Sequence, residues 1–506
     1  MRESRIGERS EVSQSASRRL RYAVIGAGMA GILAAIKLDE RGEDFAVFEK
    51  ADRLGGTWRD NRYPGLTCDV PAHAYTYSFA PWPEWSAYYA AGEEVRTYFE
   101  WVAERYRIGA SIHYGREVVD CAWDDHAAEW TLTFQDGVTM QAEVVIAASG
   151  VLHHPNLPDI PGLSSFAGEA FHSAQWNDCV ELDGKRVGVI GNGSTGVQLI
   201  TALHDRVERL VHFQRSPQWI MPVPQFVYTD DQREAFRTNP ALIDAIRNDP
   251  QYWSNIYRFA DGLTDPESPQ MGEIEAYCRA NLEGTIKNPE LREKLRPNYR
   301  AACKRLIYSW QYYDCVQSPG VFVETGGIDK VVPDGILMKD GTLHPLDVIV
   351  LATGFKADRF IRPTVVRGRD GRSLDDFWAT RPRAHFAVAM PGFPNFFMLN
   401  GPSGPVGNFS LIDIAERQWG YIDQLLEPLR AADARAVEPR ADAFEAYEER
   451  RVDAARKTIF GSGCTSWYLD KTGVPAIWPW SYQAFADAMA EPVLEQFSFE
   501  PATQEA

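Results

Sequence analysis

The chain has 506 residues, enough for two or three domains with full cores. Its net charge of -18 at pH 7 argues against nucleic acid as the main partner, because phosphate backbones require a surplus of Lys and Arg. Apolar runs stay well short of the roughly 20 residues that span a bilayer. Residues 1–19 are polar and lack the apolar core of a secretory signal, so we expect a disordered N-terminal arm there.

Seven cysteines are scattered along the chain, and they include no Cys-x-x-Cys pair. This odd number without a pattern predicts free thiols in a reducing cytosol, and hence a cytoplasmic protein. It also argues against the disulfide reductases, which need a redox-active cysteine pair. The sequence predicts no metal site.

A first glycine-rich motif, Gly26-Ala-Gly28-Met-Ala30-Gly31, follows a β-like run at 20–25 and opens a helical pattern at 29–38. The first glycine permits a tight turn, the second lets the backbone approach a pyrophosphate, and the third allows close packing of helix and strand. The strand expected at 45–48 ends at Glu49, where a ribose hydroxyl would bind. These features predict one dinucleotide site.

Two segments rich in turn formers follow at 54–58 and 61–69. The Gly55-Gly56 pair allows close approach to a cofactor, whereas the alternative for both segments is a long surface loop. Their position next to the first motif favours the cofactor.

A second glycine-rich motif, Gly191-Asn-Gly193-Ser194-Thr195-Gly196, lies between a strand at 185–190 and a helix at 197–203. The next strand, 210–214, ends at Arg215-Ser216 instead of at an acid. An acid suits the free 2′-hydroxyl of NAD, whereas an arginine suits the 2′-phosphate of NADP. A solvated strand-end arginine is the alternative. Two pyrophosphate sites are typical of a flavin enzyme reduced by a nicotinamide, so we expect FAD and NADPH.

The predicted fold is α/β, with two Rossmann-like dinucleotide-binding domains and a helical insertion. The apolar strands 144–150 and 348–355 predict two chain crossings between the domains. We therefore expect an FAD-binding domain at 20–155 that resumes at 340–506, and an NADP-binding domain at 156–339. Its insertion at about 217–299 has helical patterns at 241–246 and 273–286, and its prolines are expected to break it into short pieces. Helical patterns at 409–426 and 443–460 precede an aromatic loop at 466–482.

The segment between the glycine motifs matches the pattern Phe-x-Gly-x-x-x-His-x-x-x-Trp, with Phe166, Gly168, His172 and Trp176 in the defining positions. This segment resembles the fingerprint of the type I Baeyer–Villiger monooxygenases, a class B flavin-dependent family. The chain departs slightly from the family pattern at Asn177, where the family typically has Pro or Asp, and at Ser149, where it often has Thr. Further motifs shared with the family run from 20 to 485: Gly55-Gly56-Thr57-Trp58, Arg62-Tyr63-Pro64-Gly65, Cys68-Asp69, Lys304-Arg305, Ala352-Thr353-Gly354-Phe355, Asn400-Gly401-Pro402 and Ser466-Trp467-Tyr468.

The resemblance implies a reaction and roles for individual residues. NADPH would reduce FAD, and a flavin C4a-peroxide formed with O2 would insert one oxygen atom next to a ketone carbonyl, giving an ester or lactone. Arg305 resembles the arginine that stabilises the negatively charged intermediates, and Asp69 the carboxylate that holds it. Lys304 resembles a second contact to the 2′-phosphate. His172 and Trp176 resemble residues that couple the domains.

Trp58 and Tyr75 resemble groups near the flavin and nicotinamide. The residues that we expect to bind the cofactors are Gly26, Gly28, Ala30, Gly31, Glu49, Gly56, Thr57, Trp58, Thr67, Cys68, Asp69, Tyr75, Val119, Gly191, Gly193, Ser194, Thr195, Gly196, Gln198, Arg215, Ser216 and Lys304.

Two alternatives stay open. A flavin monooxygenase that oxygenates nitrogen or sulfur has the same two motifs, although Trp176, Asp69 and the Lys304-Arg305 pair favour the ketone reaction. A non-catalytic protein that binds FAD and NADPH is disfavoured by Arg305 and Asp69. The sequence names neither the ketone nor the oligomeric state.

Overall fold

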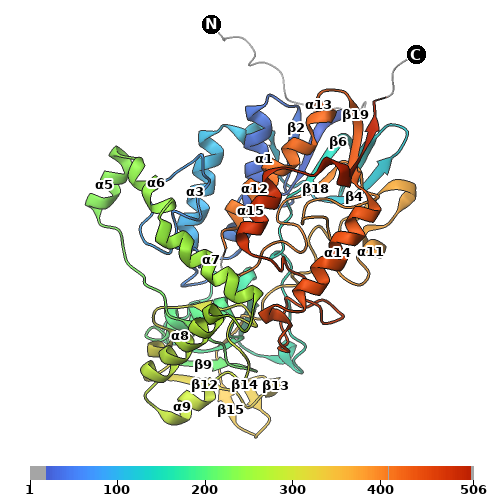
Figure 1. Ribbon diagram of the computed structural model, residues 1–506. Helices are drawn as coiled ribbons and strands as arrows, with labels where there is room; N and C mark the ends of the chain where they lie inside the picture. The colour runs from blue at the N-terminus through green and yellow to red at the C-terminus, as the bar shows by residue number, and fades with distance from the viewer. Residues whose placement is uncertain (1–18, 408, 503–506) are drawn as a thin grey trace.

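The computed structural model describes residues 19–407 and 409–502. Except for residue 19, the arm predicted at 1–19 lies outside these ranges. Two large sheets organise the described chain, and they lie in the upper and lower halves of Figure 1.

The first sheet has eight strands in the described chain, in the order β17-β4-β5-β6-β1-β2-β3, with β18 paired to β6. Its strands are β1 (Arg19–Ile25), β2 (Phe45–Phe48), β3 (Ile112–His113), β4 (Val118–Asp124), β5 (Glu129–Phe134), β6 (Thr139–Ala147), β17 (Val365–Arg367) and β18 (Phe396–Met398). Strand β1 pairs in parallel with both β2 and β6. Helix α1 (Met29–Glu40) connects β1 to β2, and most of its residues are buried.

The second sheet has the order β12-β9-β8-β16-β7. Its strands are β7 (Glu169–His172), β8 (Arg186–Ile190), β9 (Arg209–Phe213), β12 (Val321–Glu324) and β16 (Val348–Leu351), all in parallel pairs. Helix α4 (Ser194–Leu203) connects β8 to β9. Each sheet therefore carries the strand–glycine motif–helix–strand unit that the sequence predicts.

The smaller sheets and the remaining helices complete the fold. The small sheets comprise β10 (Ile220–Met221) with β11 (Ile307–Tyr308), β13 (Ile328–Val332) with β14 (Gly335–Met338) and β15 (Leu343–Pro345), and β19 (Ala434–Pro439) with β20 (Phe497–Pro501). The helices outside the insertion are α2 (Thr57–Asp60), α3 (Gly92–Arg105), α10 (Tyr312–Cys315), α11 (Leu374–Phe377), α12 (Leu411–Leu425), α13 (Glu427–Arg430), α14 (Ala441–Ala455) and α15 (Tyr482–Ala490).

The domain boundary predicted at residue 340 is wrong. Strand β16 pairs in parallel with β8, so the second sheet continues to Leu351. The chain leaves the first sheet after β6 and returns to it at β17. The sequence of a buried apolar strand does not show which sheet the strand joins, so only the pairing of β16 places the domain boundary.

The insertion contains α5 (Asp230–Thr238), α6 (Ala241–Arg247), α7 (Pro250–Thr264), α8 (Pro269–Thr285) and α9 (Pro289–Lys294). The expectation that prolines break it into short pieces is wrong for α7 and α8, which have 15 and 17 residues. Pro250, Pro269 and Pro289 are the first residues of their helices, where proline's missing N–H costs nothing. The preceding Asp249, Ser268 and Asn288 cap these helices, a combination that favours long helices. In Figure 1, α5 and α6 lie to the left of α3 in the upper half, and α8 and α9 lie beside the second sheet.

The expectation that all cysteines are free thiols is also wrong. Cys303 and Cys464 form a disulfide, although 161 residues separate them. The other cysteines are free, as predicted, and of these Cys179 is exposed.

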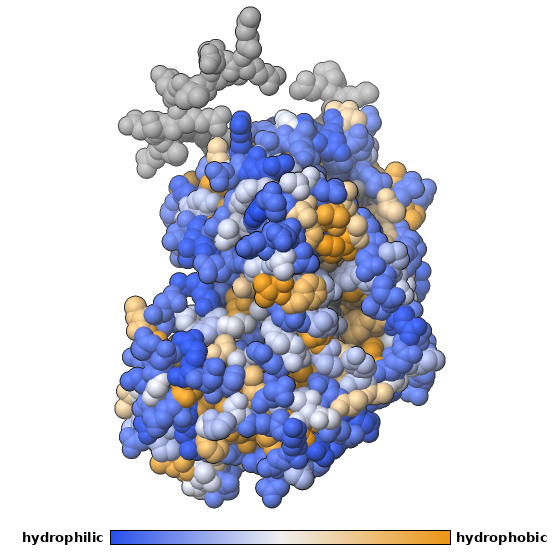
Figure 2. Space-filling model, turned by 90° about the vertical axis from the view of Figure 1, so that its left-hand side faces the viewer, coloured by the Kyte–Doolittle hydropathy of each residue, from blue (hydrophilic) through white to orange (hydrophobic). Residues whose placement is uncertain are grey.

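The surface is mostly hydrophilic on the face drawn in Figure 2, with apolar residues in separate patches. Within residues 19–407 and 409–502, no helix combines the length and apolar character required to cross a bilayer.

Candidate active site

The first glycine motif forms a tight backbone turn between β1 and α1. Gly26 has a left-handed φ of 102°, and a Cβ on Gly31 would lie 1.8 Å from the Gly26 carbonyl oxygen. Ala30 is buried in the first turn of α1. Gly28 caps α1 without a side-chain hydrogen bond, which leaves the first N–H groups of the helix for a ligand. This geometry fits a pyrophosphate.

Glu49 lies at the end of β2 and is buried. Its carboxylate accepts hydrogen bonds from the backbone N–H of Ala27 at 2.8 Å and of Ala51 at 3.0 Å, and from the Arg59 guanidinium at 3.0 Å. These bonds fix the carboxylate beside the glycine motif. Val119 lies on β4 and is 36% exposed.

The Gly55-Gly56 turn packs against the first motif. A Cβ on Gly56, whose φ is 52°, would lie 3.1 Å from the Gly28 Cα. Thr57 then begins α2. The Trp58 indole donates a hydrogen bond to the Tyr75 hydroxyl at 3.1 Å. The structure thus brings these predicted residues together at the start of α1.

The second glycine motif repeats the first. Gly191 has a φ of 111°, and a Cβ on Gly196 would lie 2.0 Å from the Gly191 carbonyl oxygen. Gly193 caps α4 without a side-chain bond, and Ser194 is the first residue of that helix. A second helix N-terminus is therefore available to a pyrophosphate.

A polar cluster follows β9, made of Arg215, Ser216 and Lys304. The Lys304 ammonium donates a hydrogen bond to the Ser216 hydroxyl at 2.9 Å and lies 4.3 Å from the centre of the Tyr299 ring. Desolvation lowers the pKa of Lys304, and the charge of Arg215 lowers it further. Among the described residues, no carboxylate forms an ion pair with Arg215 or Lys304. Two cations beside a hydroxyl fit a phosphate group.

The loop at 61–69 docks on α4, so the two dinucleotide sites meet. The Gln198 amide donates to the Thr67 carbonyl and hydroxyl, each at 3.0 Å. The Tyr63 hydroxyl donates to the Gln198 side-chain oxygen at 2.8 Å and accepts a hydrogen bond from Thr195 at 3.2 Å. A Cβ on Gly65 would lie 2.7 Å from the Gln198 carbonyl oxygen, so only glycine permits this approach.

This loop ends in the ion pair between Asp69 and Arg305. The guanidinium donates to the Asp69 carboxylate at 2.6 Å and to the Gly407 carbonyl at 2.7 Å. Desolvation alone would lower the pKa of Arg305, but the Asp69 charge and the adjacent Tyr468 outweigh it and raise the pKa. The Arg305 side chain is 28% exposed and that of Asp69 21%, so both can be reached by a ligand. Next to Asp69, burial raises the pKa of the Cys68 thiol, which stays protonated.

The segment predicted as a fingerprint lies at the junction of the domains. A Cβ on Gly168 would lie 2.3 Å from the Asp347 carbonyl oxygen and 2.9 Å from the Phe166 ring. His172 is buried, and its Nε2 lies 3.0 Å from the carbonyl of Gly354, where the chain leaves the second sheet. Burial lowers the pKa of His172, so the ring is neutral at pH 7. The Trp176 carbonyl accepts a hydrogen bond from Arg62 of the first domain at 3.5 Å. These contacts are structural.

Comparisons with known proteins agree with this geometry. A profile of the flavin-binding monooxygenase-like family matches residues 19–231. An uncharacterised monooxygenase of Mycobacterium tuberculosis is 44% identical over 435 residues, which are 86% of this chain and 87% of the relative. A Baeyer–Villiger monooxygenase of Streptomyces coelicolor is 37% identical over 464 residues, 91% of this chain and 89% of the relative. The chain belongs to the Baeyer–Villiger monooxygenases.

A solved structure of this family supports the fold. Cyclohexanone monooxygenase of Rhodococcus sp. Phi1, bound to NADP+, matches with a TM-score of 0.85 and 30% identity over 96% of this chain and 100% of that one. The predicted family, α/β fold class and enzyme class are confirmed. The chain is an FAD-dependent monooxygenase that uses NADPH as donor, as predicted.

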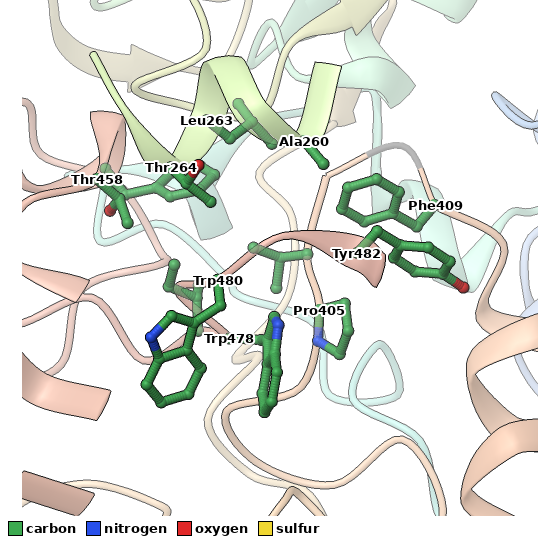
Figure 3. A pocket seen from close by; sticks show the side chains of 12 residues that line it. Ala260, Leu263, Thr264, Pro405, Phe409, Thr458, Trp478, Trp480 and Tyr482 are labelled. Carbon is green, nitrogen blue, oxygen red and sulfur yellow. The ribbon is translucent and has the colours of Figure 1, made fainter. Parts of the chain in front are cut away.

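An aromatic cavity of this Baeyer–Villiger monooxygenase adjoins the ion pair. It lies between α7, the residues Pro405, Val406 and Phe409 on either side of Gly407, and the C-terminal aromatic loop (Figure 3). In Figure 3 the stacked rings of Phe409 and Tyr482 lie on one side of the pocket, and the neighbouring rings of Trp478 and Trp480 lie on another. The full lining is Ala260, Leu263, Thr264, Pro405, Val406, Phe409, Thr458, Phe460, Ile477, Trp478, Trp480 and Tyr482.

Sequence reasoning missed several residues of the site. Tyr63 links the domains, and Gly407 and Tyr468 contact Arg305. Tyr63 and Tyr468 both lie in motifs shared with the family, which was the one available signal. Gly407 acts through its backbone carbonyl, and because every residue has one, the residue type does not indicate this role.

Proposed function

We propose that Arg305, held by Asp69, is the catalytic residue for insertion of an oxygen atom next to a ketone carbonyl. This proposal rests mainly on the Arg305–Asp69 ion pair, which is partly exposed where the two dinucleotide sites meet. FAD and NADPH, when bound, supply the redox chemistry and the activation of O2. The protein positions the reactants and sets the local charge.

The charge of Arg305 suits this role. A fixed guanidinium stabilises negative charge that develops on oxygen, and it does so most strongly where water is scarce. The raised pKa of Arg305 keeps it cationic at every working pH. Asp69 accepts a hydrogen bond from one N–H group of the guanidinium, and the Gly407 carbonyl accepts one from a second. These two bonds fix the orientation of the remaining N–H donors. Asp69 also offsets part of the charge.

We assign FAD to the first sheet and NADPH to the second. The N-terminus of α1, the Gly55-Gly56 turn and Glu49 would hold the FAD pyrophosphate and ribose, with Trp58 and Tyr75 on the side of its reactive ring. Val119 would contribute an apolar contact at the adenosine end.

The NADPH would lie with its pyrophosphate at α4 and its 2′-phosphate between Arg215, Ser216 and Lys304. The absence of a carboxylate partner for either cation in the described chain supports a preference for NADPH over NADH. The contacts of Gln198 with Thr67 would hold the nicotinamide side of α4 against the loop that carries Asp69.

We propose that the substrate is an apolar cyclic or aryl ketone. O2 is the second substrate, and the proposed location of the reaction is the cytoplasm. The ring-rich cavity beside Gly407 supports a flat apolar substrate, because aromatic walls favour burial of such groups. The similarity to cyclohexanone monooxygenase supports a cyclic ketone.

The experiment supplies the enzyme with NADPH and isotopically heavy O2, together with linear, cyclic, aryl and steroidal ketones and one thioether. We expect an ester or lactone that contains one heavy oxygen atom. Sulfoxide alone, without ester from any ketone, would establish the sulfur-oxygenating alternative. Absence of oxygen-dependent NADPH consumption would establish a non-catalytic role.

A further inference from the structure

A second cavity borders the Phe409–Tyr482 ring pair. The two rings stack with their centres 4.8 Å apart, and both of them line the aromatic cavity as well as this second one. In Figure 3 the Tyr482 hydroxyl points away from Trp478 and Trp480. It donates a hydrogen bond to Asp413, which lines the second cavity. The two cavities are therefore neighbours that share an aromatic wall.

The second cavity adjoins segments of the proposed active site. Ala74, the residue before Tyr75, lines this cavity, and so does Ser410. The Ser410 hydroxyl donates to the Ala74 carbonyl at 2.9 Å. This bond joins the segment that contains Tyr75 to the segment that follows Gly407, whose carbonyl accepts a hydrogen bond from Arg305. A ketone bound at Arg305 therefore has both cavities beside it.

The second cavity differs from the first because charged side chains line it, among them Arg247 of α6 and Glu416 of α12. The Arg247 guanidinium donates to the Tyr77 carbonyl at 2.7 Å, and within the described ranges no carboxylate forms an ion pair with it. Glu416 Oε1 accepts hydrogen bonds from the Ser78 N–H at 2.9 Å and from the Ser78 hydroxyl at 2.8 Å. Its Oε2 has no partner in the part of the chain that the structure describes.

Tyr252 of α7 adds a third polar group to the lining. Its hydroxyl has no hydrogen-bond partner among residues 19–407 and 409–502. Burial raises the pKa of Tyr252, so the hydroxyl stays protonated and can donate. Asp413, by contrast, is occupied, because it also accepts a hydrogen bond from Arg417 at 2.8 Å. The lining thus offers unused donors on Arg247 and Tyr252 and an unused acceptor on Glu416.

This set of side chains favours a neutral ligand group that both donates and accepts. A carboxylate would face Glu416 and Asp413, and an ammonium group would face Arg247. A hydrocarbon would displace water from these charges without replacing its hydrogen bonds. A hydroxyl can accept from Arg247 or Tyr252 and donate to Glu416.

We propose that this cavity is a subsite for a hydroxyl group that the ketone carries at a distance from its carbonyl. The inference rests on the proposed function and narrows its substrate class to a ring ketone with one hydroxylated end. The ring lies in the aromatic cavity, and the hydroxyl lies beside Arg247, Tyr252 and Glu416. These three residues determine specificity and touch none of the reacting atoms.

The test supplies the FAD-loaded enzyme with NADPH, O2 and cyclohexanones that carry an ethyl, hydroxyethyl, aminoethyl or carboxymethyl group opposite the carbonyl. We expect kcat/KM for ester formation to be about tenfold higher for the hydroxyethyl ketone than for the ethyl ketone, the size of one hydrogen bond to a charged group. Both charged ketones should react less efficiently than the hydroxyethyl ketone. A hydroxyethyl-to-ethyl ratio of one or less, or a preference for either charged ketone, would overturn the proposal.

Two variants locate the preference in the cavity. Tyr252→Phe removes a hydroxyl that has no partner in the described chain, so the fold is kept and the ratio should fall about threefold. Arg247→Met removes the guanidinium and should bring the ratio close to one. The matched controls are Tyr277→Phe, at a tyrosine that is 62% exposed, and Arg258→Met, at an arginine that pairs with Glu273 and lines neither cavity. A lower ratio in either cavity variant supports the subsite, whereas the wild-type ratio in both, or an equal loss in the controls, would overturn it.

The subsite and the proposed function fail in different ways. Ester from the hydroxyethyl and ethyl ketones with the same kcat/KM would overturn the subsite and leave the role of Arg305 intact. Absence of ester from every ketone would overturn the proposed function. Calorimetric titration of the FAD-loaded enzyme with the same two ketones then tests the cavity alone, and equal dissociation constants would overturn the subsite.

Discussion

Replacement of Lys304 by Ala should convert this enzyme's preference for NADPH into near-indifference between the two nicotinamide donors. The ammonium is part-exposed and donates to Ser216 at 2.9 Å, in the cluster proposed for the 2′-phosphate. A hydrogen bond to a charged group is worth about 1.5–3 kcal/mol, and partial exposure favours the lower end. At about 1.4 kcal/mol per factor of ten, KM for NADPH should rise about 10- to 30-fold.

The assay compares KM for NADPH and NADH in steady-state oxidation with a fixed ketone. KM for NADH should stay the same, because NADH has no phosphate at this position. Lys339→Ala, at an exposed lysine of the same domain, removes the same charge away from the cluster and is the matched control. Equal losses for both donors, or no loss for NADPH, would refute the assignment.

The pH dependence follows from the lowered pKa of Lys304, whose causes are desolvation first and the Arg215 charge second. The cationic form exists below the pKa, so NADPH affinity is lost as the pH rises through it, earlier than for an ordinary lysine. Arg215→Ala removes the second cause and should move this loss to higher pH. An unchanged profile would contradict the coupling between the two cations.

Three further predictions concern the junction of the domains and the second glycine motif. Asp69→Asn keeps the shape but not the charge beside Arg305, so ester formation should fall about 10- to 100-fold while anaerobic flavin reduction is retained. Gln198→Ala removes three hydrogen bonds between the domains and should lower the free energy of unfolding by about 1–3 kcal/mol in a urea titration. Gly196→Ala would place a Cβ 2.0 Å from the Gly191 carbonyl oxygen and should abolish NADPH binding, measured by fluorescence quenching.

Each of these predictions has a contrary result. Ester formation at the wild-type rate by Asp69→Asn would show that the reaction does not need the Asp69 carboxylate. Unchanged stability of Gln198→Ala would show that the domain junction depends on other contacts. Gly272→Ala, in α8 and outside both glycine motifs, is the control for the third prediction, because no atom lies within 4 Å of the added Cβ; loss of NADPH binding in this variant would contradict the steric argument.

Local features of the fold could be predicted from the sequence. The strand expected at 45–48 is β2, and the helix expected from residue 29 is α1, because apolar runs, glycines and a strand-end acid are all local signals. The prolines of the insertion are also local signals, but their meaning depends on the residue before each of them. Each of Pro250, Pro269 and Pro289 follows a capping residue, a pair that marks the start of a helix and not its end.

Pairings between distant segments could not be predicted from physics alone. Lys304 meets Ser216 because the chain returns to the end of β9 after the whole insertion, and Cys303 meets Cys464 across 161 residues. No local pattern encodes such contacts. The role of Lys304 entered through family resemblance, and the disulfide, which is not part of that resemblance, was missed.

The most direct test of the central claim is Arg305→Ala, studied in two half-reactions. Anaerobic reduction of bound FAD by NADPH should proceed at the wild-type rate, because Arg305 belongs to neither dinucleotide motif. With O2 and ketone, ester formation should fall about 100- to 1,000-fold, the usual cost of removing one group that stabilises negative charge in the transition state. Ester formation at the wild-type rate would contradict the account.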